Sequence, residues 1–258
     1  MQILPIPGCA ECAQSSALVA LPYLFHGDNF ILSLKIPPSP PQIAMIHTVS
    51  GLIPLFDGLA RHHLPHWQGF NMLDESLLRS TIRDGALSQT TTWRLAQMVH
   101  SAAEAGASAI VVTCSSLGPA VDAAKPFSPV PVFRIDEGMA LAAVTHGPRI
   151  GVLATLSTTL DPTRDLIVSS AARAGRPCTV IAELAEGAFQ KLGAGDTAGH
   201  DAIVAHCLRA LAPRTDVIVL AQASMARALA LVQDDLHPHP VLTSPDLGMQ
   251  HIARQLLV

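Results

Sequence analysis

Apolar and polar residues follow two different periods along this chain, and the two periods alternate. Predominantly apolar runs of strand length occur at 43–47, 108–113, 130–135, 149–155, 179–184 and 216–220. Helical spacing is clearest over 91–105, where Leu95, Val99 and Ala102 share one face and Gly106 follows as a C-cap. Further helices are predicted over 137–145, 163–174, 201–211 and 247–256.

This alternation over about 210 residues predicts an α/β fold of two Rossmann-like halves, each a three-layer arrangement around a parallel sheet. We expect residues 42–133 with 245–258 to form the first half, onto which the last helix packs back, and 134–244 to form the second. Residues 1–41 lack the pattern and end in a proline tract, so we expect a poorly ordered N-terminal extension. A chain beginning near Gln42 should then keep its thermal stability.

The two halves contain similar segments where an apolar strand gives way to small polar residues and then to a helix. These segments are Thr113-Cys114-Ser115-Ser116 and Ala221-Gln222-Ala223-Ser224. Ligands of open α/β sheets bind outside the carboxyl ends of the strands. We therefore expect both segments to face one cleft between the halves.

Composition narrows the classes of partner. Charged residues make up 14% of the chain, the net charge is −4, and Lys and Arg do not cluster, which argues against nucleic acid and acidic membranes. No apolar run reaches the ~18 residues of a membrane span, and no GxGxxG or GxxxxGKS/T fingerprint suggests a nucleotide. The oligomeric state, including a homo-oligomer, stays open.

Cysteine and histidine usage bears on location and metals. An odd number of cysteines favours a reduced, cytoplasmic protein; they are Cys9, Cys12, Cys114, Cys178 and Cys207. Cys9 and Cys12 form a single CxxC without the second ligand pair that zinc needs. The histidines at 62, 63 and 66 flank a proline, and no carboxylate or cysteine follows them at ligand spacing, so we interpret them as a solvated loop and expect no metal.

Cys114 is the strongest candidate for chemistry. It follows a predicted strand and precedes a predicted helix, where free N–H groups and the helix dipole favour a thiolate and lower its pKa. The alternative is a structural cysteine, because free cysteines are commonly buried. We assign that structural role to Cys178, placed in a strand, and to Cys207, placed in a helix.

The segment around Cys114 resembles the first catalytic-cysteine segment of the aspartate/glutamate/hydantoin racemase superfamily. Motifs similar to a subgroup of it follow in order over residues 43 to 256: 47–50, 74–77, 135–137, 151–155, 158–159 with 162–163, 195–196 with 200–201, and 219–225. The resemblance implies an enzyme without cofactor that acts on a small carboxylate, such as an amino acid or a related acid. It also implies two cysteines, one on each side of the substrate's α-carbon.

The second cysteine is missing. We expect Ala223 to stand in its place, with Ser224 nearby as a weak acid. Cys114 alone would act as base or nucleophile and exchange a proton on one face only. An isomerase or racemase-type reaction is favoured; a decarboxylase, a C–C lyase and a carboxylate-binding module without catalysis remain alternatives.

Hydroxyl and amide groups at the strand ends are the expected carboxylate ligands, although Ser and Thr there also serve as helix N-caps. The candidates for substrate binding are Thr48, Ser50, Ser115, Ser116, Thr155, Thr158, Thr159, Gln222 and Ala223. Four acidic residues could each act as a general base or form a salt bridge, and we favour structural roles for them: Asp74, Glu75, Asp136 and Glu137. His200 and Asp201 could assist proton transfer, but we expect Asp201 to cap a helix.

Overall fold

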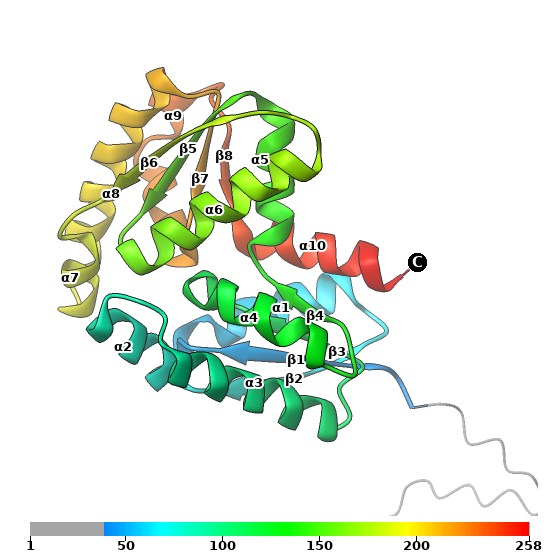
Figure 1. Ribbon diagram of the computed structural model, residues 1–258. Coiled ribbons are helices and arrows are strands. Elements are labelled where there is room, and N and C mark those ends of the chain that lie inside the picture. The colour runs from blue at the N-terminus through cyan, green and yellow to red at the C-terminus, as the bar shows by residue number, and fades with distance from the viewer. Residues whose placement is uncertain (1–38, 258) are drawn as a thin grey trace, which may run out of the picture. The chain divides into compact units, whose positions relative to one another are not determined.

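The computed structural model describes residues 39–257, so the expected extension and the CxxC at Cys9 and Cys12 lie outside the described residues except for 39–41. These residues form two four-stranded parallel sheets flanked by helices (Figure 1), which confirms the predicted α/β fold. No helix among them is both long enough and apolar enough to cross a membrane.

The first sheet has the strand order β2-β1-β3-β4. Its strands are β1 (Gln42–His47), β2 (Gln68–Leu73), β3 (Ala109–Val112) and β4 (Val132–Arg134). They are connected by α1 (Ile53–His63), α2 (Glu75–Asp84), α3 (Gln89–Glu104) and α4 (Gly118–Ala124), with short 3₁₀ turns η1 (Ser50–Leu52), η2 (Ser115–Leu117) and η3 (Lys125–Phe127).

The second sheet repeats this order as β6-β5-β7-β8. Its strands are β5 (Arg149–Ala154), β6 (Thr179–Leu184), β7 (Val217–Leu220) and β8 (Val241–Thr243). The helices are α5 (Glu137–His146), α6 (Ser157–Arg173), α7 (Ala188–Gly193), α8 (Thr197–Leu211), α9 (Gln233–Leu236) and α10 (Ser244–Leu256), with 3₁₀ segments η4 (Ala212–Arg214) and η5 (Ala223–Leu231).

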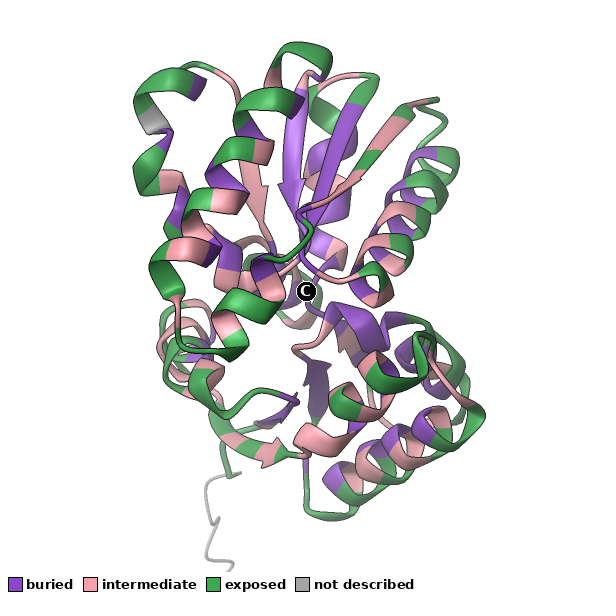
Figure 2. Ribbon diagram, turned by 90° about the vertical axis from the view of Figure 1, so that its left-hand side faces the viewer, coloured by how far each residue is buried: buried purple, intermediate pink, exposed green. Residues whose placement is uncertain are grey.

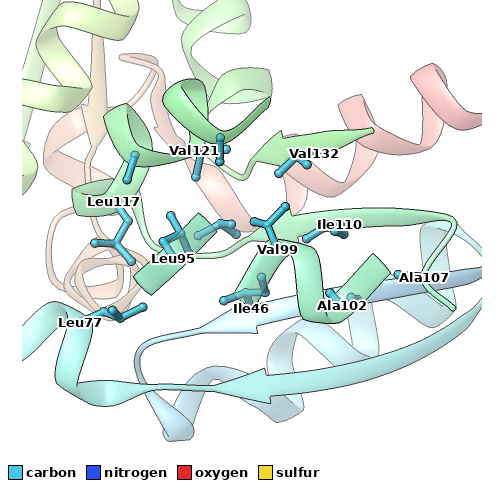
Figure 3. Close-up of a cluster of buried hydrophobic side chains, with 14 residues drawn as sticks. Ile46, Leu77, Leu95, Val99, Ala102, Ala107, Ile110, Leu117, Val121 and Val132 are labelled. Atoms are coloured by element: carbon cyan, nitrogen blue, oxygen red, sulfur yellow. The ribbon is translucent and has the colours of Figure 1, made fainter. Parts of the chain in front are cut away.

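Apolar side chains cover both faces of each sheet. The central strands β1, β3, β5 and β7 are almost entirely buried, as Figure 2 shows by their purple colour. On one face of the first sheet, Ile46 and Ile110 pack with Leu95, Val99 and Val121 from α3 and α4 (Figure 3). Burial on both faces explains why these strands are continuous apolar runs in the sequence.

The C-terminal helix α10 connects the two cores. Met249 and Ile252 pack with Ile43 and Met45 of β1, whereas Leu247 contacts the core between α5, α6 and the second sheet.

Two glycines permit a close approach of α10 to the backbone of neighbouring segments. A Cβ at Gly248 would lie 2.0 Å from the carbonyl oxygen of Ile135, and one at Gly138 in α5 would lie 2.2 Å from that of Leu247.

Several local expectations were wrong. The histidine-rich segment is only partly a solvated loop: α1 continues through His63, whose Nε2 lies 2.8 Å from Asp246 Oδ1 in α10, whereas His66 lies in an exposed turn. Asp201 is not a cap, because α8 begins at Thr197 and Asp196 accepts from Gly199 N–H. The helix expected from 163 begins at Ser157, since a proline at 162 removes only one backbone donor. Cys178 lies one residue before β6 rather than inside a strand.

Candidate active site at the carboxyl ends of the strands

Cys114 lies directly beyond β3, in extended backbone at the N-cap of η2. Its side chain is partly exposed. Burial raises the pKa of the Cys114 thiol, while hydrogen bonds from the Thr48 hydroxyl and from the N–H groups of Leu117 and Ser116 act in the opposite direction without cancelling it. The expected lowering of the thiol pKa is therefore wrong, because desolvation of the charged form outweighs the donors at the strand end.

The neighbouring hydroxyl residues form a buried polar layer. Thr48 is 4% exposed, Ser115 is 8% exposed and Ser116 is 2% exposed. Ser116 Oγ lies 2.6 Å from Thr159 Oγ1, in the first turn of α6. This hydrogen bond joins the end of β3 in the first half to the end of β5 in the second.

The strand register identifies which residue of the second half corresponds to Cys114. Ile43 pairs with Ala109 in the first sheet as Ile150 pairs with Val217 in the second. Counting from these pairs, Cys114 corresponds to Gln222, which also occupies an extended N-cap position, at the start of η5. Gln222, and not Ala223, therefore occupies the place expected for a second thiol.

The same register makes Thr155 the counterpart of Thr48. Gln222 Oε1 accepts a hydrogen bond from Thr155 N–H at 2.7 Å, and Gln222 Nε2 donates to Thr155 Oγ1 at 2.8 Å. The Cys114–Thr48 contact of the first half is thus repeated as a Gln222–Thr155 contact in the second. A carboxamide neither donates nor accepts a proton near neutral pH, so this second position cannot transfer one.

A hydrogen-bond network around His47, which the sequence analysis did not identify, contacts the residue before Cys114. His47, fully buried at the end of β1, contacts Asn71 Oδ1 with Nε2 at 2.8 Å and Thr113 Oγ1 with Nδ1 at 2.9 Å; Asn71 in turn donates to Asp57. Burial lowers the pKa of His47, although Asn71 and Asp57 oppose it. A polar side chain directly after the apolar run 43–46 was the available signal.

The four acidic candidates have structural partners. Asp74 caps α2 by accepting from Ser76 N–H at 2.9 Å and pairs with Arg94. The Glu75 carboxylate accepts from Ser50 Oγ at 3.0 Å and from Arg79, which places Ser50 in an exposed contact. Asp136 is fully buried against Arg134 with two hydrogen bonds of 3.0 Å, and Glu137 lies 3.5 Å from Lys125 Nζ.

The remaining candidates occupy the second half. Ala223 and Ser224 begin η5 and are half-buried, and Thr158 lies in α6 with a buried hydroxyl that has no partner among the described residues. His200 Nδ1 lies 2.6 Å from Asp201 Oδ1 in α8. Within residues 39–257, no group of three or more His, Cys, Asp or Glu is arranged to hold a metal ion.

Comparisons with solved structures show the same fold. A glutamate racemase isoform from Bacillus anthracis aligns with a TM-score of 0.67 at 16% identity, over 85% of this chain and 82% of its own. The allantoin racemase from Klebsiella pneumoniae has a TM-score of 0.61 at 19% identity, over 84% and 87%. An aspartate racemase homologue from Pyrococcus horikoshii has a TM-score of 0.59 at 14% identity, over 83% and 98%.

The sequence family is established independently of these likenesses. No individual curated protein sequence matches the chain. The model of the Asp/Glu/Hydantoin racemase family, however, matches residues 54–252, well over half of the chain and including both strand-end segments. The chain therefore belongs to the Asp/Glu/Hydantoin racemase family and is a racemase-like enzyme.

Proposed function

We propose that Cys114 transfers a proton to or from the carbon next to a carboxylate or related carbonyl group of a small acid, without a cofactor. The observation that carries the proposal is the position of Cys114 at the carboxyl end of β3, next to Thr48, Ser115 and Ser116. Hydroxyl and N–H donors at such a place stabilise the negative charge that develops on a carboxylate when its α-proton is removed.

The substrate class is suggested by the relatives. The matched structures include an allantoin racemase and a glutamate racemase. In both of the molecules named, the carbon that can be inverted is bonded to a carboxylate or carbonyl carbon. We propose an amino acid or a related small acid for this chain. Thr155, directly beyond β5, and Thr158 and Thr159, in the first turn of α6, are proposed as its further ligands.

A decarboxylase is the second candidate. Because burial favours the neutral thiol, Cys114 is a proton donor in the resting protein. A donor on one face, with Gln222 rather than a thiol at the corresponding position, would also protonate the carbanion left when a carboxylate departs as carbon dioxide. Release of carbon dioxide from a malonate-type acid would distinguish this reaction from racemisation.

Proton exchange in deuterated water tests the proposal. Small amino acids, hydroxy acids and dicarboxylates are incubated with the enzyme, and loss of the α-proton signal is followed by NMR. For the enantiomer whose α-proton faces Cys114, Cys114→Ser should lower exchange by about 10²–10⁴-fold, the contribution of a positioned acid–base group. Cys207→Ser, in α8, is the matched control and should leave the rate unchanged.

Alkylation gives an independent measurement. The acid that exchanges should also slow the reaction of iodoacetamide with Cys114 and leave that with Cys207 unaffected. Equal exchange by the wild type and Cys114→Ser would show that Cys114 is not the proton-transfer group.

A further inference from the structure

We propose that His200 is the second proton-transfer residue of this site and acts on the substrate face opposite Cys114. The inference rests on the proposed function and completes it. With Gln222 at the position that corresponds to Cys114, the second half has no thiol for the opposite face. Inversion of a carbon needs a group there that gains or loses a proton.

His200 differs from the other buried histidine of the described residues in one respect. Both ring nitrogens of His47 have hydrogen-bond partners, whereas Nε2 of His200 is buried and has none within residues 39–257. A buried polar atom without a partner is costly, and native proteins satisfy most such atoms. A substrate group that reaches Nε2 would supply the missing partner.

The other ring nitrogen of His200 is held in place. Asp201 Oδ1 lies 2.6 Å from His200 Nδ1 and also contacts Arg227. Burial alone would raise the pKa of Asp201, but the hydrogen bonds from His200 and Arg227 together lower it, so the carboxylate is charged. In the neutral imidazole a charged acceptor at Nδ1 favours the tautomer with its proton on Nδ1 and its lone pair on Nε2, as in a catalytic His–Asp pair.

Packing places His200 at the correct end of the second sheet. Leu211, the last residue of α8, lies against Gly151 near the start of β5, and Ile203 lies against Gly187 just beyond the end of β6. The first turn of α8, which contains His200, is therefore at the carboxyl edge of the strands (Figure 1). Arg227, which contacts Asp201, belongs to η5, the segment that starts directly after Gln222.

An imidazole and a thiol on opposite faces can complete one balanced proton transfer. With a lone pair on Nε2, His200 takes the α-proton, and the electron pair of the broken C–H bond moves into the carboxylate as an enediolate. The Cys114 thiol then donates its proton to the opposite face of that carbon, and the pair returns from the enediolate to form the new C–H bond. The products are an imidazolium paired with Asp201 and a thiolate next to Thr48. This form of the enzyme acts on the other enantiomer, or exchanges its protons with solvent.

Separating inversion from exchange tests the proposal. For an acid that exchanges, the wild type should produce the opposite enantiomer in a chiral assay. His200→Gln should lose inversion by about 10²–10⁴-fold while Cys114 continues to exchange the proton on its own face. His206→Gln, exposed on the same helix, is the matched control. Wild-type exchange without inversion, or inversion that survives His200→Gln, would overturn the role of His200 and leave that of Cys114 intact.

A measurement on the wild-type protein that needs no turnover tests the role of His200 even if a variant misfolds or the proposed reaction does not occur. Imidazole ¹⁵N NMR of the wild type should show His200 with its proton on Nδ1. The Nε2 signal should shift when the acid that best protects Cys114 from iodoacetamide is added. If no acid protects Cys114, succinate is used as the probe. Asp201→Asn, which keeps His200, should alter the tautomer and slow inversion. An unmoved Nε2 signal with a bound acid would refute the proposal.

Discussion

At the scale of single residues, the thiol of Cys114 experiences two opposing influences. Burial raises its pKa, and hydrogen bonds from Thr48, Leu117 and Ser116 lower it by a smaller amount. The balance favours the neutral thiol in the free protein, so the residue starts as an acid and becomes a base only after it has given up its proton. Removing one of the opposing donors should therefore shift the balance measurably.

Thr48→Val is the substitution that tests this balance. It removes the hydroxyl that stabilises the thiolate, so the pKa of Cys114 should rise and the rate of its alkylation should need higher pH. The measurement is the pH profile of iodoacetamide modification, read by mass spectrometry at Cys114. Thr155→Val is the control, because Thr155 contacts Gln222 instead. A profile unchanged by Thr48→Val would show that the hydroxyl does not reach the sulfur.

The correspondence of Gln222 with Cys114 leads to a gain-of-function prediction. In a His200→Gln background, Gln222→Cys should restore inversion, because it places a thiol at the position that mirrors Cys114. A positioned donor contributes about 10²–10⁴-fold. Ala223→Cys in the same background places the thiol one residue further along η5 and should restore little. The chiral assay compares the two, and recovery by Ala223→Cys alone would contradict the register.

At the scale of elements, one buried ion pair connects β4 with α4 and with the residue before α5. Arg134 in β4 bonds to Asp136 before α5 and to Asp122 in α4. Arg134 is 5% exposed and Asp136 is fully buried. The guanidinium also lies against Gly118, where a Cβ would be 2.2 Å from Nη2. These contacts fix the start of α4 directly after the Cys114 segment.

Arg134→Met should therefore destabilise the fold. It leaves the Asp136 carboxylate buried without its partner, which costs about 3–5 kcal/mol in comparable cases. Urea denaturation measures the free energy of unfolding. Adding Asp136→Leu should recover much of the loss, and Arg149→Met, which breaks the exposed pair with Asp216, should cost far less. Equal losses for Arg134→Met and Arg149→Met would show that burial is unimportant here.

At the scale of the whole molecule, α10 packs against both cores, and its close approach to the backbone at Ile135 requires glycine at position 248. Gly248→Ala would push a methyl group into the carbonyl of Ile135 and should cost about 1–3 kcal/mol, as overpacking does. Gly58→Ala, in α1, is the control: its Cβ meets nothing within 4 Å, and Ala favours a helix by about 0.5–1 kcal/mol. Thermal unfolding of both variants measures the opposite signs. Equal stability of Gly248→Ala and the wild type would contradict the close approach.

The sequence predicts six of the eight strands that the structure describes, including β6 with its partly exposed positions, and misses β2 and β8. The fully covered strands β1, β3, β5 and β7 are apolar runs that the pattern identifies directly. Strand β2 has mostly exposed positions, and β8 is three residues long with half-buried positions, so neither has a distinctive pattern. Local sequence also placed Cys114 at a strand end correctly.

The parts of the site that sequence alone missed depend on distant partners. Gln222 is identified as the counterpart of Cys114 only by the strand register, because nothing local separates it from Ala223. The pKa of Cys114 depends on how deeply the surrounding fold buries the thiol, and the residues next to Cys114 in the sequence do not determine that burial. The His47 network requires residues from β1, β2, α1 and the segment directly after β3 to meet. Each needs tertiary structure.

The unlike residues on the two strand-end edges have a kinetic consequence. Enantiomers have equal free energies in water, so a racemase that uses Cys114 on one face and His200 on the other must have the same kcat/KM in both directions, as the Haldane relation demands. The difference between a thiol held by Thr48 and an imidazole held by Asp201 can then appear only in kcat and KM separately. The enantiomer that saturates the enzyme at lower concentration must turn over more slowly, in the same proportion.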